Sequence, residues 1–147
     1  MSSVKLKINN LTELEEFAKF LLPYLQPNIF LILQGELGVG KTTLTQLISK
    51  NLGIKEKVTS PTFNILQRYQ IKSNFYLNHF DFFRLDSNDN LDSFQELTVD
   101  NLNVIEWGEK NPQFWQEKKY IKIKLMKKNV KERLVFLSFS FPVKNEK

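Results

Sequence analysis

The hydrophobic and polar positions of the chain follow two periods, one typical of helices and one typical of strands. The helical period comes first, with apolar residues at Leu14, Phe17, Ala18, Leu21, Leu22 and Leu25. Residues three and four apart share one face of a helix, so this spacing predicts an amphipathic helix. Thr12 and Glu15 fit a capping box at its start, and Pro23 is expected to kink or end it early.

Short apolar runs predict strands further along the chain. One lies within residues 29–34, and a second, which ends in a carboxylate, covers residues 102–107. Residues 63–71 and 74–83 are also β-like. Pro61 biases the residue before it away from helix, so the segment before these two strands is predicted to be a loop.

Helical segments separate these strands. A second helix is predicted over residues 41–52, where Gly53 provides the stop signal. Residues 91–97 predict a short helix, and residues 111–117 predict a helical turn.

The C-terminal part alternates polar and apolar residues over 120–126 and 133–141, which predicts a hairpin joined by K-K-N-V-K-E. Strands mixed with helices indicate an α/β fold, here a three-layer domain with a mixed central sheet and a C-terminal β-hairpin. With 147 residues, 41% hydrophobic and 25% charged, the chain fits a single globular domain spanning residues 1–147.

Composition narrows the setting. There is no cysteine, so disulfides and thiolate metal sites are excluded. The longest purely apolar run, residues 29–33, is far too short to span a bilayer, and the N-terminus lacks the apolar region of a signal peptide. We therefore expect a cytoplasmic protein without a membrane partner.

The net charge of +5 is unevenly distributed. Residues 118–147 carry ten Lys and Arg against two Glu, a net charge of +8, whereas residues 1–117 carry −3. A basic C-terminal third can attract nucleic acid or an acidic partner, and it can equally be a solvated strand face with a lysine-rich tail.

The sequence G-E-L-G-V-G-K-T-T, residues 35–43, lies between the first apolar strand and the second helix. It contains G-x-x-x-x-G-K-T, whose glycines let successive amides point inward around an anion. The helix that follows adds the positive end of its dipole. Lys41 is expected to contact the β- and γ-phosphates, and the Thr42 hydroxyl to ligate Mg²⁺. The motif therefore predicts a phosphate-binding loop for a nucleoside triphosphate.

Hydrolysis also needs an acid that holds the metal and a group that positions water. Glu106 ends the apolar run L-N-V-I-E-W, and Asp81 lies in N-H-F-D-F-F-R-L. Either could instead be a surface carboxylate, and either could pair with Arg84. His79 is the single histidine, and we interpret it as a structural hydrogen-bonding residue.

Other segments refine the choice of nucleotide enzyme. The S-P-T-F segment, residues 60–63, could close over the γ-phosphate as a switch, or it could be an ordinary turn. Neither N-K-x-D nor a D-x-x-G after the loop is present, which disfavours GTPases. No long insertion exists to form the substrate lid of a small-molecule kinase.

Taken together, the motifs resemble those of the TsaE family, also called YjeE. G-E-L-G-V-G-K-T-T is similar to its G-x-L-G-x-G-K-T-T, and S-P-T-F to its S-P-T-[FY]. H-F-D-F-F-R-L, residues 79–85, is similar to H-x-D-x-Y-R-L, and I-E-W, residues 105–107, matches I/V-E-W. Two departures stand out: Phe83 replaces the family tyrosine, and Gly108 replaces the proline often found after the tryptophan.

This resemblance implies a P-loop NTPase-like fold and a Mg²⁺-dependent ATPase with ATP as its nucleotide. The residues implied to contact the nucleotide are Gly35, Gly38, Val39, Gly40, Lys41, Thr42, Thr43, Thr62 in the switch loop and Trp107. Thr12 and Arg133 are the candidates for contacts near the adenine, Thr42 and Glu106 for Mg²⁺, and Lys41, Asp81 and Glu106 for catalysis.

The resemblance also implies a pathway and partners. TsaE proteins are ATPases required for threonylcarbamoylation of the tRNA adenosine beside the anticodon, and they act with a complex of TsaD and TsaB. The complex transfers the group, so contact with tRNA would be indirect. Two alternatives stay open: a kinase, which would phosphorylate an acceptor, and a non-enzymatic nucleic-acid binder, whose affinity would fall steeply with salt.

Overall fold

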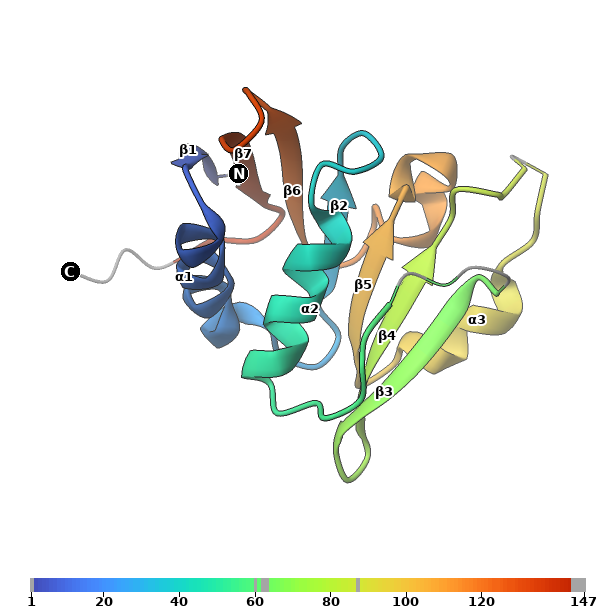
Figure 1. Cartoon of the computed structure of the whole chain (residues 1–147). Helices are drawn as coiled ribbons and strands as arrows, with labels where there is room; N and C mark the ends of the chain where they lie inside the picture. The colour runs from blue at the N-terminus through green and yellow to red at the C-terminus, as the bar shows by residue number, and fades with distance from the viewer. Residues whose placement is uncertain (1, 60, 62–63, 87, 144–147) are drawn as a thin grey trace.

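The computed structural model describes residues 2–59, 61, 64–86 and 88–143. Its centre is a seven-stranded sheet in the order β1-β7-β6-β2-β5-β4-β3 (Figure 1). The strands are β1 (Ser2–Ile8), β2 (Phe30–Gln34), β3 (Leu66–Lys72), β4 (Phe75–Asp81), β5 (Leu102–Glu106), β6 (Tyr120–Lys127) and β7 (Arg133–Phe139).

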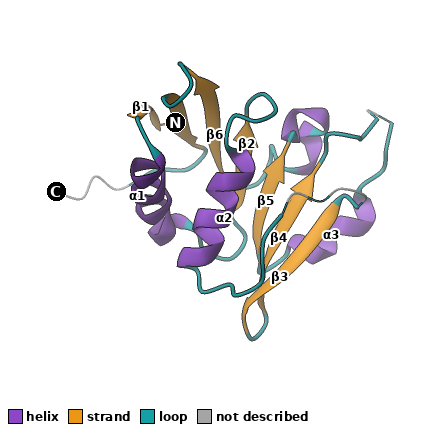
Figure 2. Cartoon of the chain, in the orientation of Figure 1, coloured by secondary structure: helices purple, strands orange, loops and turns teal. Residues whose placement is uncertain are grey.

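Helices connect and cover these strands (Figure 2). The α-helices are α1 (Leu11–Leu21), α2 (Lys41–Asn51) and α3 (Asp92–Thr98), and 3₁₀ turns are η1 (Leu22–Tyr24), η2 (Gly108–Lys110) and η3 (Pro112–Phe114). As expected from Pro23, the first helix ends at Leu21 and continues only as a 3₁₀ turn.

The sheet is mixed, which confirms the α/β fold class. β2, β5, β4 and β6 run parallel, β6 and β7 form the C-terminal hairpin, and β1 and β3 pair antiparallel at the two edges. Parallel strands place their carboxyl ends at one edge of the sheet. The ends of β2, β5 and β4 therefore meet, and the segments that follow them can build one site.

Two hydrophobic cores lie on opposite faces of the sheet. Side chains alternate along β2, so Leu31 packs into the core beneath α1 and α2, whereas Ile32 packs into the other. The second core is rich in aromatic rings, and Phe80 lies 5.3 Å from Phe114, centroid to centroid. α1 and α2 lie together in front of the sheet in Figure 1.

The predicted start of the first helix was wrong. The residue at the cap is Asn10, whose side chain accepts a hydrogen bond from the Glu13 amide at 2.9 Å. Glu13 in turn accepts a hydrogen bond from the Asn9 amide at 2.7 Å. The helix therefore begins with a reciprocal arrangement like a capping box, but at Asn10, two residues before the predicted Thr12.

The edge strand β1 was not predicted, although V-K-L-K-I alternates apolar and basic residues over residues 4–8. It pairs with β7 from Ser2↔Phe139 to Ile8↔Arg133. The C-terminal hairpin is thereby extended to a three-stranded antiparallel unit made from both ends of the chain. Within the described residues, no helix has the length and apolar character needed to cross a membrane.

Candidate nucleotide-binding site

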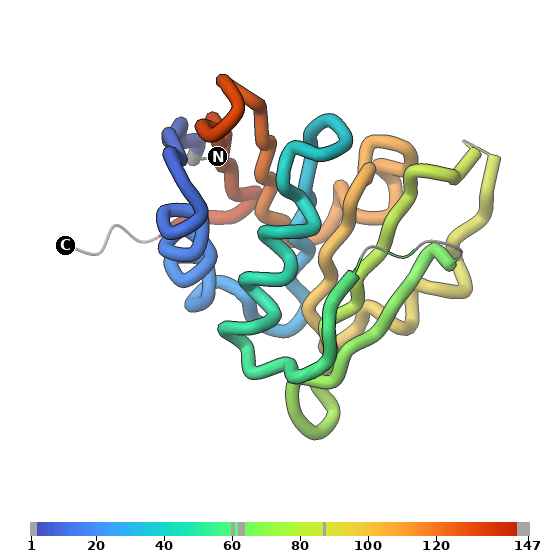
Figure 3. The backbone as a smooth tube through the Cα atoms, in the orientation of Figure 1, coloured from blue at the N-terminus to red at the C-terminus, as the bar shows by residue number. Residues whose placement is uncertain are grey.

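The glycine-rich loop leaves β2 and enters α2 directly, a path that Figure 3 follows as a smooth tube. Gly35, Gly38 and Gly40 all have positive φ, at 144°, 77° and 119°. These values lie in backbone regions that residues with a Cβ rarely adopt. Gly40 is also the N-cap of α2 and offers no side chain to its first amides. Those amides are suited to bind an anion.

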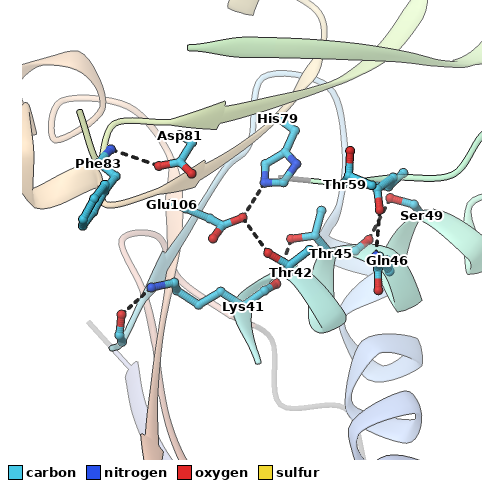
Figure 4. Close-up of polar contacts among 12 residues, drawn as sticks. Lys41, Thr42, Thr45, Gln46, Ser49, Thr59, His79, Asp81, Phe83 and Glu106 are labelled. Atoms are coloured by element: carbon cyan, nitrogen blue, oxygen red, sulfur yellow. Dashed lines mark hydrogen bonds and ion pairs between the residues drawn. The ribbon is translucent and has the colours of Figure 1, made fainter. Parts of the chain in front are cut away.

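Lys41, the first residue of α2, turns back over this loop (Figure 4). It is 5% exposed, its Nζ donates a hydrogen bond to the Gly35 carbonyl, and it lies 4.2 Å from the ring centroid of Trp107. Burial lowers the pKa of Lys41, an effect that Glu106 and other nearby carboxylates oppose. A bound phosphate group would stabilise the charged form of Lys41, which burial disfavours.

Glu106 ends β5 opposite the start of α2. Its Oε2 accepts from the Thr42 hydroxyl at 3.5 Å and lies 2.6 Å from Nε2 of His79 (Figure 4). His79 is completely buried, and its Nδ1 has no hydrogen-bond partner in the described structure. With its proton on Nε2, the ring donates to Glu106 and leaves only a lone pair unsatisfied. His79, the single histidine of the chain, is therefore placed as the structural hydrogen-bonding residue that the sequence predicts.

Asp81 ends β4, and it pairs with Glu106 in the register of the two strands. Its Oδ1 accepts from the Phe83 amide at 2.9 Å. Burial raises the pKa of Asp81, and the Phe83 amide acts in the opposite direction. The two carboxylates therefore stand at neighbouring strand ends on the same edge as the loop.

A pocket of about 350 Å³ unites these groups. Its walls include Gly38, Gly40, Lys41, Thr42 and Thr43 from the loop and helix, Asp81 and Glu106 from the strand ends, and Phe83, Arg84 and Trp107. Pro61 of the S-P-T-F segment also lines it, whereas Thr62, the predicted switch residue, lies outside the described residues.

Four other predicted residues do not line this pocket. Gly35 and Val39 lie at the back of the loop beside β6, and Thr12 is exposed on α1. Arg133 lies behind the loop, where its Nε donates to the Val39 carbonyl at 3.0 Å. Arg133 thus ties the loop to the start of β7.

The oxygen donors fit Mg²⁺. A hydroxyl from Thr42 and a carboxylate from Glu106 are hard ligands, the kind that Mg²⁺ prefers. Among the described residues, no cluster of three or more His, Cys, Asp or Glu side chains forms a metal site. Mg²⁺ is usually held by one or two protein oxygens together with water and phosphate, so this sparse donor set suits it.

Sequence reasoning included Trp107 in the site, but it missed the contact of Trp107 with Phe83 and the bond between His79 and Glu106. Phe83 and Trp107 lie 5.0 Å apart, centroid to centroid. Trp107 has a φ of 61°, uncommon for a residue with a large side chain. One signal was available for His79: on a strand it shares a face with Asp81, two residues later.

The profile of the family described as "Threonylcarbamoyl adenosine biosynthesis protein TsaE" matches residues 8–135. The chain belongs to the TsaE family. Relatives named "tRNA threonylcarbamoyladenosine biosynthesis protein TsaE" include those of Rickettsia felis, 41% identical over 105 residues, and Haemophilus influenzae, 34% identical over 100 residues. These matches cover 69% and 65% of this chain.

The chain spans 61% of the length of the Rickettsia felis TsaE protein and 63% of that from Haemophilus influenzae. Among solved structures, Bacillus subtilis YdiB superposes with a TM-score of 0.71 over 92% of this chain and 84% of its own. At 24% sequence identity, this likeness supports the fold alone.

Proposed function

We propose that this TsaE protein is a Mg²⁺-dependent ATPase that serves tRNA threonylcarbamoyladenosine biosynthesis. The observation that carries the proposal is the loop of three positive-φ glycines that opens into α2 and faces Glu106 and Asp81 across one pocket. Backbone amides, a buried lysine and paired strand-end carboxylates are the parts that phosphoryl transfer to water requires.

Each residue has a distinct task in this proposal. The amides of Gly38 to Thr43 and the ammonium of Lys41 bind the β- and γ-phosphates. Thr42 and Glu106 would hold Mg²⁺, which when bound neutralises developing charge on the phosphates. Asp81 orients the water that attacks the γ-phosphorus, while the bond to the β-γ bridging oxygen breaks to give ADP and phosphate.

The family supports a role in the tRNA modification pathway, and we propose that TsaD and TsaB are the partners. The pathway name belongs to the family and its relatives. In this proposal the ATPase is an accessory subunit, and its turnover resets the complex that transfers the threonylcarbamoyl group.

The test pairs two lysines of the same helix. Lys41→Ala should weaken ATP binding by about 100-fold or more, because the buried charge beside the phosphates is lost. Lys50→Ala, at the exposed end of α2, should leave the ATP dissociation constant within about twofold. Calorimetry with ATP and Mg²⁺ gives both constants, and equal constants for the two variants would refute the assignment of the loop.

A second measurement separates ATPase from kinase chemistry. Glu106→Gln should slow release of inorganic phosphate by about 100-fold, the usual effect of removing one electrostatic group from a phosphoryl or acyl transition state. Lys50→Ala again serves as control. Phosphate that appears on a small-molecule acceptor in place of free phosphate would contradict an ATPase and favour a kinase.

A further inference from the structure

One face of the sheet is covered over only part of its width. On β2, Ile32 belongs to the core beneath α3, η2 and η3. That core ends at β6, where Tyr120 packs edge-on against Trp115 with 5.0 Å between centroids. The same face continues over β6, β7 and β1, while α1 and α2 cover the opposite face.

Strand register identifies the side chains on this continuation. Lys5 of β1 stands opposite Phe136 of β7, which stands opposite Lys124 of β6. Two residues further along, Leu134 stands opposite Met126. None of these three apolar side chains belongs to either core of the described structure, and Met126 is 43% exposed. We call this surface the open wing face.

The open wing face is strongly basic. Lys7 of β1 and Lys122 of β6 lie on the same face as Lys5 and Lys124, because alternate residues of a strand share a face. The face therefore carries four lysines. One of these lysines is paired: Lys7 binds Glu132, at the β6–β7 turn, at 2.8 Å. A sheet face with this excess of positive charge attracts a polyanion.

The kind of basic residue helps to distinguish an acidic protein from RNA as the partner of this face. Protein interface cores are enriched in Arg, Tyr and Trp and depleted in Lys. This face has lysines and no arginine, with the half-buried ring of Phe136 among them and Nζ of Lys5 5.9 Å from its centroid. Lysine ammonium groups bind phosphates as point charges, and an aromatic ring on an open sheet can pack against an RNA base.

We propose that the open wing face binds RNA, with its lysines on the phosphate backbone and Phe136 against a base or ribose. Neither Lys5, Lys122 nor Phe136 lines the nucleotide pocket. Lys124 and Met126 border the back of the glycine-rich loop, but the residues altered in the test lie outside the proposed ATPase pocket, so each proposal can fail without the other.

The test compares two double charge reversals in the full chain. Lys5→Glu with Lys122→Glu alters the open wing face, and Lys55→Glu with Lys57→Glu alters exposed lysines after α2 by the same net charge. The probe is an unmodified tRNA transcript, and the readout is fluorescence anisotropy from 50 to 200 mM salt. The wing pair should weaken binding at least tenfold and reduce the log–log salt slope by about 2, because two phosphate contacts are lost. The control pair should weaken it less than threefold.

Wild-type protein that fails to bind the transcript at 50 mM salt, or equal loss in both pairs, overturns the proposal. So does a wing pair that binds RNA normally but no longer associates with the protein partners of the pathway, since that face would then dock a protein. ATP turnover is measured on the same samples. RNA binding that survives Lys41→Ala, with turnover unchanged in the wing pair, supports an RNA surface independent of the nucleotide.

Discussion

Burial disfavours the charged forms of both Asp81 and Lys41. The pKa of Lys41 is lowered and that of Asp81 is raised, in each case chiefly because burial penalises the ionised form. Groups perturbed in this way and gathered in one pocket are typical of functional sites. The protein without nucleotide is therefore expected to give up some stability to keep these groups in place.

Asp81→Asn should make the nucleotide-free protein more stable at pH 7. A carboxyl whose pKa is raised on folding contributes stability that is complete below its unfolded pKa and is lost as pH rises through the folded pKa. Asparagine keeps an acceptor for the Phe83 amide and removes the ionisation. Denaturant midpoints at pH 7 and pH 4 measure the effect.

The stability advantage of Asp81→Asn should shrink towards pH 4. At pH 7 the same variant should also release phosphate more slowly, because it lacks the carboxylate proposed to orient water. Glu56→Gln, an exposed carboxylate, is the control and should change neither quantity. An advantage that is the same at both pH values would show that burial of the charge is not its cause.

His79 is the second residue whose effect can be isolated. It contacts Glu106 through Nε2, so His79→Leu removes a donor from a predicted metal ligand, whereas His79→Gln offers an amide donor in its place. We expect the leucine variant to raise the Mg²⁺ concentration needed for half-maximal turnover by about tenfold, the lower end of such outer-shell effects. The glutamine variant should recover part of it.

Mn²⁺ binding to the protein with a non-hydrolysable ATP analogue, followed by electron paramagnetic resonance, gives the same comparison without turnover. If both His79 variants lose metal affinity equally and unfold at the same denaturant concentration, His79 acts only through packing. Its role as a positioning residue would then be wrong.

At the scale of elements, the glycine-rich loop is fixed by its neighbours as well as by its own residues. A Cβ on Gly35 would lie 2.6 Å from the Leu125 carbonyl oxygen of β6 and 2.7 Å from Val39 Cγ1. Arg133 of β7 also donates a hydrogen bond to the Val39 carbonyl. The loop is thus held against two strands of the C-terminal hairpin.

Gly35→Ala should therefore lower the free energy of unfolding by more than the positive φ of Gly35 alone implies. Gly53, with a φ of 83° and open space around it, is the matched control. Gly53→Ala should cost about 1 kcal/mol for its positive φ, and Gly35→Ala about 2–4 kcal/mol because backbone must also move. Urea unfolding measures both, and equal losses would mean that the contact with β6 is not restrictive.

Elements with strong local signals could be predicted from the sequence. The runs that became β2 and β5 are short, apolar and bounded by turn residues, and α2 starts at a motif whose geometry requires a helix. The start of α1 was misplaced because Asn10 and Thr12 are both good caps, and only the path of the chain from β1 selects Asn10.

The candidate site also has residues that local motifs predict and contacts that only the fold determines. Local motifs identified Lys41, Thr42, Asp81 and Glu106, and the parallel strands bring them to one pocket. The brace from Arg133 to Val39 joins residues 94 positions apart, and the contact of His79 with Glu106 spans 27. Such contacts depend on strand order, which no single segment of sequence determines.

At the scale of the whole molecule, both ends of the chain support the glycine-rich loop. β1 pairs with β7, β7 pairs with β6, and β6 pairs with β2, from which the loop emerges. α2 packs in the same core as α1. A ligand that binds the loop only in the folded chain therefore stabilises every one of these elements together.

ATP with Mg²⁺ should accordingly raise the thermal unfolding midpoint of the whole protein. At 100 times the dissociation constant the gain is about 2.7 kcal/mol, or roughly 5–10 °C for a chain of this size. AMP at the same concentration should give almost no shift if the loop binds the β- and γ-phosphates, as proposed, and not the base. Lys41→Ala should lose the shift with ATP, and Lys50→Ala should keep it. An equal shift with AMP would instead place the binding energy in the nucleoside, and the glycine-rich loop would no longer explain how this protein holds its ligand.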